Sequence, residues 1–191
     1  MVRTFIVYVA DHPGVLNRVS SLFRRRGYNI ESLTVGHTHQ PGISRMTVVV
    51  AIDAQGAPLL TANLYKLSEV QRVDDITSVP SLHRELVIAK IPFSQSSQPE
   101  LLRILESYGA RVLEAGPESL VIEATGPEET VNRLVDSLKP FGILEMTRTG
   151  RVAMTSSRAS VLPSSGLKSA SDAQIPVWNS TTSADLPRNC S

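Results

Sequence analysis

The 191-residue chain has little of several residue types, and each shortage excludes some classes of protein. It has one cysteine, Cys190, so a disulfide within the chain is excluded and a reducing cytoplasm is favoured. No apolar run approaches the roughly 20 residues of a membrane span, and no secretory leader is visible. The formal net charge of +1 gives no electrostatic basis for binding nucleic acid. We therefore expect a cytoplasmic protein that needs neither a membrane nor a nucleic acid.

Constellations that carry catalysis or bind metals are also missing. His37 and His39 could share one face of a strand end, but no cysteine or acidic cluster completes a metal site. Residues 36–42 contain two glycines without the spacing of a phosphate-binding loop. The basic run at 24–26 either complements a helix end in solvent or contacts a partner. We expect no catalytic residue, no metal and no cofactor on this chain.

Hydrophobic periodicity is the strongest positive signal, and it predicts the same order of elements twice. In the first half it predicts strands at 5–9, 30–35, 46–52 and 70–76, and helices at 15–23 and 60–67. In the second half it predicts strands at 85–93, 110–115, 120–125 and 143–152, and helices at 99–105 and 127–138. Each half reads βαββαβ, which is the ferredoxin-like arrangement.

The predicted fold class is therefore α+β, with two ferredoxin-like domains in tandem. We place the first domain at 1–78, a linker at 79–83 and the second domain at 84–155. Residues 156–191 are dominated by Ser, Ala, Thr, Pro and Asn, and we expect a disordered C-terminal tail there.

A turn at 11–16, Asp-His-Pro-Gly-Val-Leu, joins the first predicted strand to the first helix. Gly14 has no Cβ, so a ligand can approach the backbone closely. The N–H groups of Gly14, Val15 and Leu16 lie at a helix start, where free N–H groups and the helix dipole bind anions. Asp11 either accepts from an ammonium group or simply forms the turn or the helix cap. A carboxylate beside an anion site suits a free amino acid.

Asn29 and Ile30 follow Gly27, which is placed to end the first helix, and they begin the second strand. Asn29 either satisfies the turn locally or faces a ligand. Within one ferredoxin-like unit the first loop and the start of the second strand are not obvious neighbours. A two-fold interface could bring the Asn29 of one copy to the turn of the other.

These motifs resemble a known family. Asp-x-Pro-Gly-Val-Leu after a strand resembles the ACT domain, a regulatory module that binds amino acids. Arg-Gly-Tyr-Asn-Ile-Glu-Ser-Leu-Thr-Val at 26–35, then Ser-Arg-Met-Thr at 44–47, resembles more specifically the small regulatory subunit of acetolactate synthase (acetohydroxyacid synthase). The resemblance is strong over 3–78 and looser over 84–155. The tail beyond residue 158 does not resemble the family.

The resemblance implies a regulatory chain of branched-chain amino acid biosynthesis that is not an enzyme by itself. In this family the small subunit binds a large catalytic subunit, which carries thiamine diphosphate, magnesium and FAD. It raises that enzyme's activity and confers feedback inhibition by valine, in some members also by leucine or isoleucine. The effector lies between two ACT domains, which implies a homodimer. The matching effector-binding positions are Asp11, Gly14, Val15 and Leu16 of one chain with Asn29 and Ile30 of the other. Many members have Asn where this chain has Asp11, so its site carries an additional negative charge.

Two other functions stay open from the residues alone. A stand-alone ACT-type amino-acid-binding regulator would act without a catalytic partner; a DNA-binding version would need a basic recognition element that this sequence lacks. An independent enzyme would need an acid, base or nucleophile arrangement, and none is visible. The sequence leaves the choice among branched-chain amino acids open.

Overall fold

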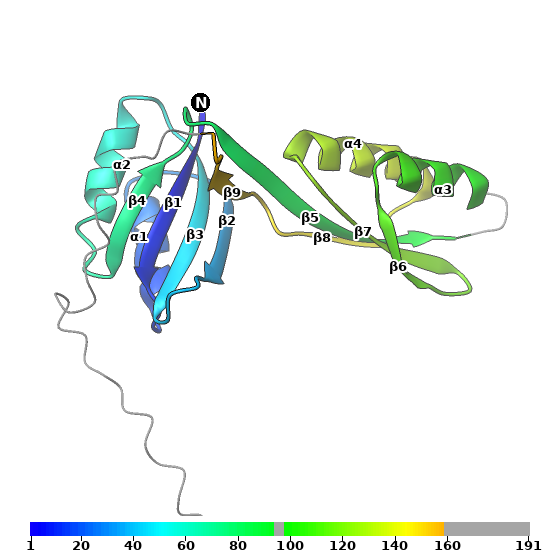
Figure 1. Cartoon of the computed structure of the whole chain (residues 1–191), viewed down its shortest axis with the longest axis horizontal. Coiled ribbons are helices and arrows are strands. Elements are labelled where there is room, and N and C mark those ends of the chain that lie inside the picture. Colours follow the sequence, from blue (N-terminus) through cyan, green and yellow to red (C-terminus); the bar gives the residue numbers. More distant parts are fainter. Residues whose placement is uncertain (94–97, 159–191) are drawn as a thin grey trace, which may run out of the picture.

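The computed structural model describes residues 1–93 and 98–158, and these form two α+β units joined by one long strand (Figure 1). The first unit contains β1 (Val2–Ala10), α1 (Val15–Arg25), β2 (Ile30–His37), β3 (Ile43–Ala51), α2 (Gly56–Leu64) and β4 (Val70–Asp75). The second contains β5 (Ser81–Pro92), α3 (Gln98–Ser107), β6 (Arg111–Ala115), β7 (Ser119–Gly126), α4 (Glu128–Leu138), the 3₁₀ turn η1 (Lys139–Phe141), β8 (Glu145–Arg148) and β9 (Val152–Thr155). No helix in these residues is long and apolar enough to cross a membrane.

Both sheets have the strand order of a ferredoxin-like unit, as the sequence predicts. The order is β2-β3-β1-β4 in the first sheet and β6-β7-β5-β8 in the second, with antiparallel pairing throughout. In each unit the first and third strands of the repeat lie at the centre, and the two helices cover one face.

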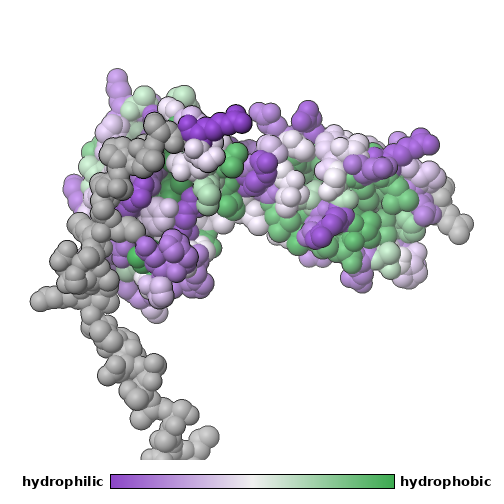
Figure 2. Space-filling view, viewed as in Figure 1, coloured by the Kyte–Doolittle hydropathy of each residue, from purple (hydrophilic) through white to green (hydrophobic). Residues whose placement is uncertain are grey.

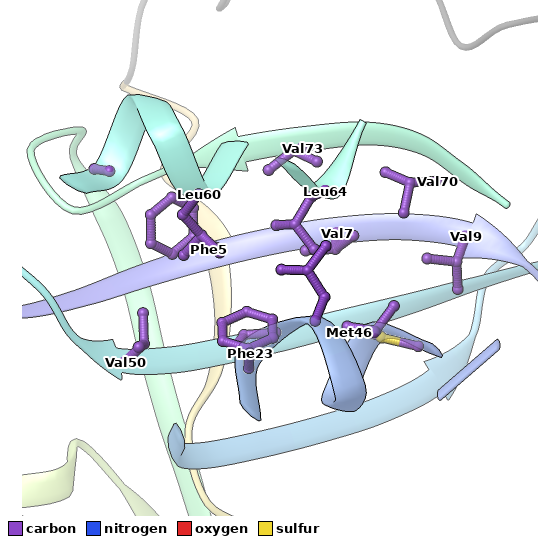
Figure 3. Close-up of a cluster of buried hydrophobic side chains, with 14 of the residues drawn as sticks. Phe5, Val7, Val9, Phe23, Met46, Val50, Leu60, Leu64, Val70 and Val73 are labelled. Atoms are coloured by element: carbon purple, nitrogen blue, oxygen red, sulfur yellow. The ribbon is translucent and has the colours of Figure 1, made fainter. Parts of the chain in front are cut away.

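The core of the first unit lies between its sheet and its two helices. Alternate residues of β1 face the helices, while the stripe on α1 faces the sheet (Figure 3). The fully buried side chains here include Phe5, Val7, Phe23, Met46, Leu60 and Leu64. The second unit repeats this plan around Ile91, Leu101, Ile122, Leu134 and Leu138. Each unit therefore has its own hydrophobic core.

The end of α1 fixes where β2 begins. Gly27 adopts φ 69°, and its N–H donates to the carbonyl of Arg24, while the N–H of Tyr28 donates to the carbonyl of Phe23. This pair of bonds is a Schellman motif, which requires the left-handed conformation that glycine adopts without strain. The rings of Phe23 and Tyr28 pack edge to face at 6.4 Å, so the chain leaves the helix in one direction and Asn29 comes directly after it.

The predicted strand at 143–152 is wrong as a single element. Gly150 adopts φ 76°, and the chain breaks there into β8 and β9. β8 pairs with the second half of β5, whereas β9 pairs with its first half, Ser81–Arg84. Residues 81–83, inside the segment expected to be a linker, thus form a two-stranded ribbon with the end of the fold. From residue 159 on, the predicted tail lies outside the described residues.

We call residues 149–155 the return segment, because here the chain comes back from the second unit to the first. Figure 1 shows β9 beside the first sheet, on the side away from α1 and α2. Ala153 of the return segment is 1 % exposed and packs with Ile6, Ile76 and Tyr8 in a small separate cluster. This cluster covers sheet residues that would otherwise expose apolar surface, and it ties the two units together.

Candidate functional site

The turn after β1 leaves a helix N-terminus open. Gly14 is the N-cap of α1 with φ 90°, and no side chain caps this helix. The N–H of Val15 reaches the carbonyl of His12 only at 3.5 Å. A Cβ built on Gly14 would have no atom within 4 Å, so the space in front of the turn is free. Backbone N–H donors at the positive end of a helix dipole, with open space before them, can bind a carboxylate.

Asp11 lies beside this helix start without capping it. Its backbone N–H donates to the carbonyl of Gly42 at 2.8 Å, which holds the turn against the start of β3. Its carboxylate lies 2.9 Å from Nδ1 of His37, the last residue of β2. The alternative that Asp11 is the N-cap is excluded, because Gly14 occupies that position. Asp11 is thus an exposed carboxylate beside the open N–H groups.

A second carboxylate residue, Glu69, helps to hold the turn in place. Glu69 is almost completely buried and forms an ion pair with Arg18 of α1. Burial raises the pKa of Glu69, but a backbone hydrogen bond at Glu69 itself, the Ser68 side chain and the nearby charges of Arg18 and His12 outweigh burial. The net pKa lies below its ordinary value. The carbonyl of Glu69 also accepts from the N–H of Ala10 at 2.8 Å, so this residue holds the end of β1 next to α1.

Asn29 and Ile30 lie at the other end of the same sheet. β1 and β2 both run antiparallel to β3, so they point the same way. His37 at the end of β2 lies near Asp11, while Ile30 pairs with Val50. With about 3.3 Å of rise per residue, the seven steps from 30 to 37 separate the two halves by about 23 Å. Within one chain, therefore, the structure brings Asp11, Gly14, Val15 and Leu16 together but not with Asn29 and Ile30.

The edge of β2 has no neighbouring strand among the described residues. β2 is the outermost strand of the first sheet. Two large apolar side chains near the turn are exposed: Leu16 at 44 % and Val35 at 42 %. Val15, in contrast, is buried in the core, so it offers only its backbone to a ligand. An unpaired edge strand with exposed apolar residues is a surface that readily pairs with another chain.

Hydrogen bonds connect β2 to the return segment. Ser32 Oγ accepts from the N–H of Arg151 at 2.9 Å, and Thr34 Oγ1 donates to the carbonyls of Thr149 and Arg151 at 3.1 and 3.3 Å. A Cβ on Gly150 would lie 2.3 Å from Ser32 Oγ, so the two segments are in close contact. The strand that begins at Ile30, directly after Asn29, is therefore mechanically linked to the second unit.

We call the contact between β2 and the return segment the joint. The side chain of Arg151 completes it. Its guanidinium donates to Thr4 Oγ1 at 2.9 Å in β1 and forms an ion pair with Glu128 in the first turn of α4. His83 lies close by, with Nε2 at 2.7 Å from Ser81 Oγ. Burial lowers the pKa of His83, and the charge of Arg151 lowers it further. His83 is thus preferred in its neutral form.

Sequence reasoning missed the joint and the His37 contact. The hydroxyls of Ser32 and Thr34 lie more than 100 residues from their partners along the chain, so no local pattern could pair them. One signal was available: an isolated glycine inside an apparent strand, at Gly150, marks a bend or a close backbone approach. From the sequence, His37 was considered only as a metal ligand; in the structure it is exposed and contacts Asp11.

Comparison with known proteins assigns this arrangement to a class. Residues 5–72 match the family model described as the ACT domain of small-subunit-like acetohydroxyacid synthase proteins, and residues 84–157 match the model for the small subunit of acetolactate synthase. A chain with an ACT domain followed by this second domain is of the regulatory-subunit type.

Individual relatives agree with that class. The chain is 43 % identical over 149 residues to an acetolactate synthase small subunit of Aquifex aeolicus, covering 78 % of each chain. It is 40 % identical to that of Bacillus subtilis, covering 80 % of this chain and 90 % of the relative. The crystal structure of the acetolactate synthase small subunit from Thermotoga maritima matches 82 % of this chain and 98 % of that one, with 32 % identity and a TM-score of 0.78. The chain belongs to the family of acetolactate synthase small subunits.

Proposed function

We propose that this chain activates the catalytic subunit of acetolactate synthase in the cytoplasm and makes it sensitive to feedback inhibition by valine. The observation that carries the proposal is the open helix start at Gly14 beside the Asp11 carboxylate, in a domain of this family. Leucine and isoleucine have the same α-amino and α-carboxylate groups, so they compete for the same polar contacts. The thiamine diphosphate, magnesium and FAD of the reaction are proposed to reside on the catalytic partner.

The turn supplies complementary groups for both charges of an amino acid. The effector carboxylate would accept from the N–H groups of Gly14, Val15 and Leu16, while its ammonium would donate to Asp11. The exposed side chain of Leu16 offers an apolar contact for a branched aliphatic side chain. Because His37 already contacts the Asp11 carboxylate, it competes with the effector ammonium for that carboxylate.

The other half of the site is proposed to come from a second copy. If β2 pairs antiparallel with the β2 of another copy near its centre, Ile30 of one copy lies near His37 of the other. Since His37 is next to Asp11, the same pairing brings Asn29 of one copy to the turn of the other. A two-fold axis then produces two equivalent sites per dimer. This pairing also satisfies the edge of β2 and covers Val35.

The return segment offers a route from the site to the second unit. An effector that pulls Asn29 and Ile30 toward the neighbouring turn would shift β2, and Ser32 and Thr34 would carry the shift to residues 149–151. Inhibition requires that the effector binds one arrangement of the units more tightly than the other. The joint is a physical element whose geometry both ends can bias.

The second unit is proposed to contribute to contact with the catalytic subunit. Apolar side chains gather on the face of this unit seen in Figure 2. Large apolar residues exposed in the second unit include Leu102, Val112, Leu113, Leu144 and Met146. A cluster of exposed apolar residues marks an interaction surface more often than a surface that stays in contact with solvent.

The experiment that tests the proposal measures acetolactate formation by the cognate catalytic subunit with and without this chain, across a valine titration. Activation that valine reverses is the expected result. Activation without sensitivity to valine, leucine or isoleucine would contradict the assignment of the effector site. No effect on the catalytic subunit, together with amino-acid binding, would instead identify a stand-alone ACT-type regulator.

A further inference from the structure

A second pocket in the first unit lies at the opposite end of α1 from the Asp11 turn. It has a volume of about 470 Å³ and opens between the C-terminal ends of the two helices. Its lining residues are Leu22, Arg25, Arg26, Asn63, Lys66 and Leu67. Pockets of this size hold small-molecule ligands. Three of the six lining side chains are cations and none is an anion, which restricts the chemistry of an occupant.

The cations are brought together by one buried amide. Asn63 is 2 % exposed, and its Oδ1 accepts from Arg26 Nη2 at 3.0 Å and from Lys66 Nζ at 3.2 Å. The two charged nitrogens therefore lie no more than 6.2 Å apart. Among the described residues, neither Arg25, Arg26 nor Lys66 forms an ion pair with a carboxylate. Like charges held this close repel each other unless an anion lies between them.

The partial negative charges at the two helix ends do not balance the three cations. Each helix C-terminus carries a partial charge of about −0.5, so α1 and α2 together supply about −1. Arg25, Arg26 and Lys66 supply three positive charges, which leaves an excess of about two. A neutral ligand would leave this excess charge unbalanced, and a cationic ligand would increase it. A dianion would balance it.

The buried amide has a free donor as well. Asn63 Nδ2 is buried and has no hydrogen-bond partner in the part of the chain that the structure describes. A buried amide donor without a partner costs free energy. If Arg26 and Lys66 turn from Oδ1 to an oxyanion between them, a half-turn of the amide would direct its N–H groups toward that oxyanion. The anion would then receive bonds from a guanidinium, an ammonium and an amide.

We propose that this pocket binds a phosphate-type dianion, either free or as part of a small phosphorylated molecule whose apolar portion lies against Leu22 and Leu67. Tetrahedral phosphate oxygens match donors that converge from several directions, and arginine binds them bidentately. The site is separate from the Asp11 turn and uses none of its residues. The inference does not rest on the regulatory function, because binding is measured on this chain alone.

The test is isothermal titration calorimetry of the full chain with pyrophosphate, inorganic phosphate and malonate, each at the same ionic strength. Saturable binding of one inorganic phosphate per chain is expected, with pyrophosphate competing for the same site and malonate, a carboxylate dianion, binding at least tenfold more weakly than phosphate. Arg26→Gln and Lys66→Gln should each raise the dissociation constant at least tenfold. Arg24→Gln is the matched control, since Arg24 is in the same basic run but does not line the pocket, and it should change the constant less than twofold.

Each other outcome overturns the proposal. An equal loss in Arg24→Gln would show only a general attraction of anions to a basic surface. Malonate binding as tightly as inorganic phosphate would overturn the phosphate assignment, and no saturable binding would overturn the site. Asn63→Leu tests the amide donor, with thermal unfolding as a check of folding because Asn63 is buried. Arg26 and Lys66 are exposed, so their variants keep the test decisive if Asn63→Leu does not fold.

Discussion

Replacing Gly14 by aspartate tests the proposed carboxylate subsite most sharply. A Cβ fits there without a clash, so the effects are limited to the backbone and the charge. At φ 90° any residue other than glycine costs about 1–2 kcal/mol of folding free energy. The new carboxylate would also compete for the N–H groups at the helix start and lie a few ångström from the effector carboxylate.

The loss of valine affinity follows from two contributions. The charge-assisted hydrogen bonds to the effector carboxylate contribute about 1.5–3 kcal/mol. Repulsion between two carboxylates about 4 Å apart adds about 1 kcal/mol in water. A total of about 3 kcal/mol weakens valine binding about 100-fold or more. Activation of the catalytic subunit should persist, because the turn is proposed to sense the effector and not to activate.

Gly14→Ala is the matched control, since it introduces the same backbone strain without the charge. Valine titrations followed by calorimetry and by acetolactate formation should show a change of only a few-fold for Gly14→Ala. Thermal unfolding should show no greater destabilisation for Gly14→Asp than for Gly14→Ala, because aspartate at the N-cap can accept from the free N–H groups of the helix start. Wild-type inhibition in Gly14→Asp would refute the site assignment, and equal loss in both variants would show that strain, not charge, is responsible.

Four further changes test other parts of the structure. Asp11→Asn should weaken valine binding about tenfold by calorimetry, because the ammonium loses an ionic acceptor; unchanged affinity would exclude Asp11 from the site. Gly150→Ala should destabilise the joint by about 2–4 kcal/mol in denaturant unfolding, since its Cβ would lie 2.3 Å from Ser32 Oγ; it should also uncouple valine binding from inhibition. Because the folded pKa of His83 lies below its ordinary 6.5, its contribution to stability is full above pH 6.5 and is lost as the pH falls through the lower folded pKa; His83→Gln should flatten that part of the stability profile. Removal of residues 159–191 should leave activation intact, because the family match ends at residue 157; lost activation would contradict this.

Local sequence patterns were sufficient for the two repeated units. The stripe of Val15, Leu16, Val19, Leu22 and Phe23 predicts a helix that packs on a sheet, and the structure buries all of these side chains except Leu16. Gly27 was correctly placed at a helix end, because only glycine adopts the Schellman geometry without strain. These predictions succeed because periodicity and capping act within a few residues.

Features formed by segments far apart in the chain could not be predicted from local sequence patterns. The segment at 143–152 is apolar enough for one strand, yet Gly150 redirects it so that β9 joins the start of β5. The contact of Ser32 with Arg151 depends on how two units meet, which hydrophobic periodicity does not encode. Local patterns do not assemble the proposed effector site either, because its halves lie at opposite ends of one sheet and would meet only in a dimer.

Mixed dimers test the central claim, a shared effector site, most directly. Gly14→Asp disables one half of each site and Asn29→Ala the other, so neither homodimer should bind valine. In a heterodimer both changes fall in the same site, and the other site is intact. After random exchange of subunits, calorimetry should recover valine binding at about a quarter of all sites, with wild-type affinity. Recovery of no binding would contradict a site shared between two copies of the chain.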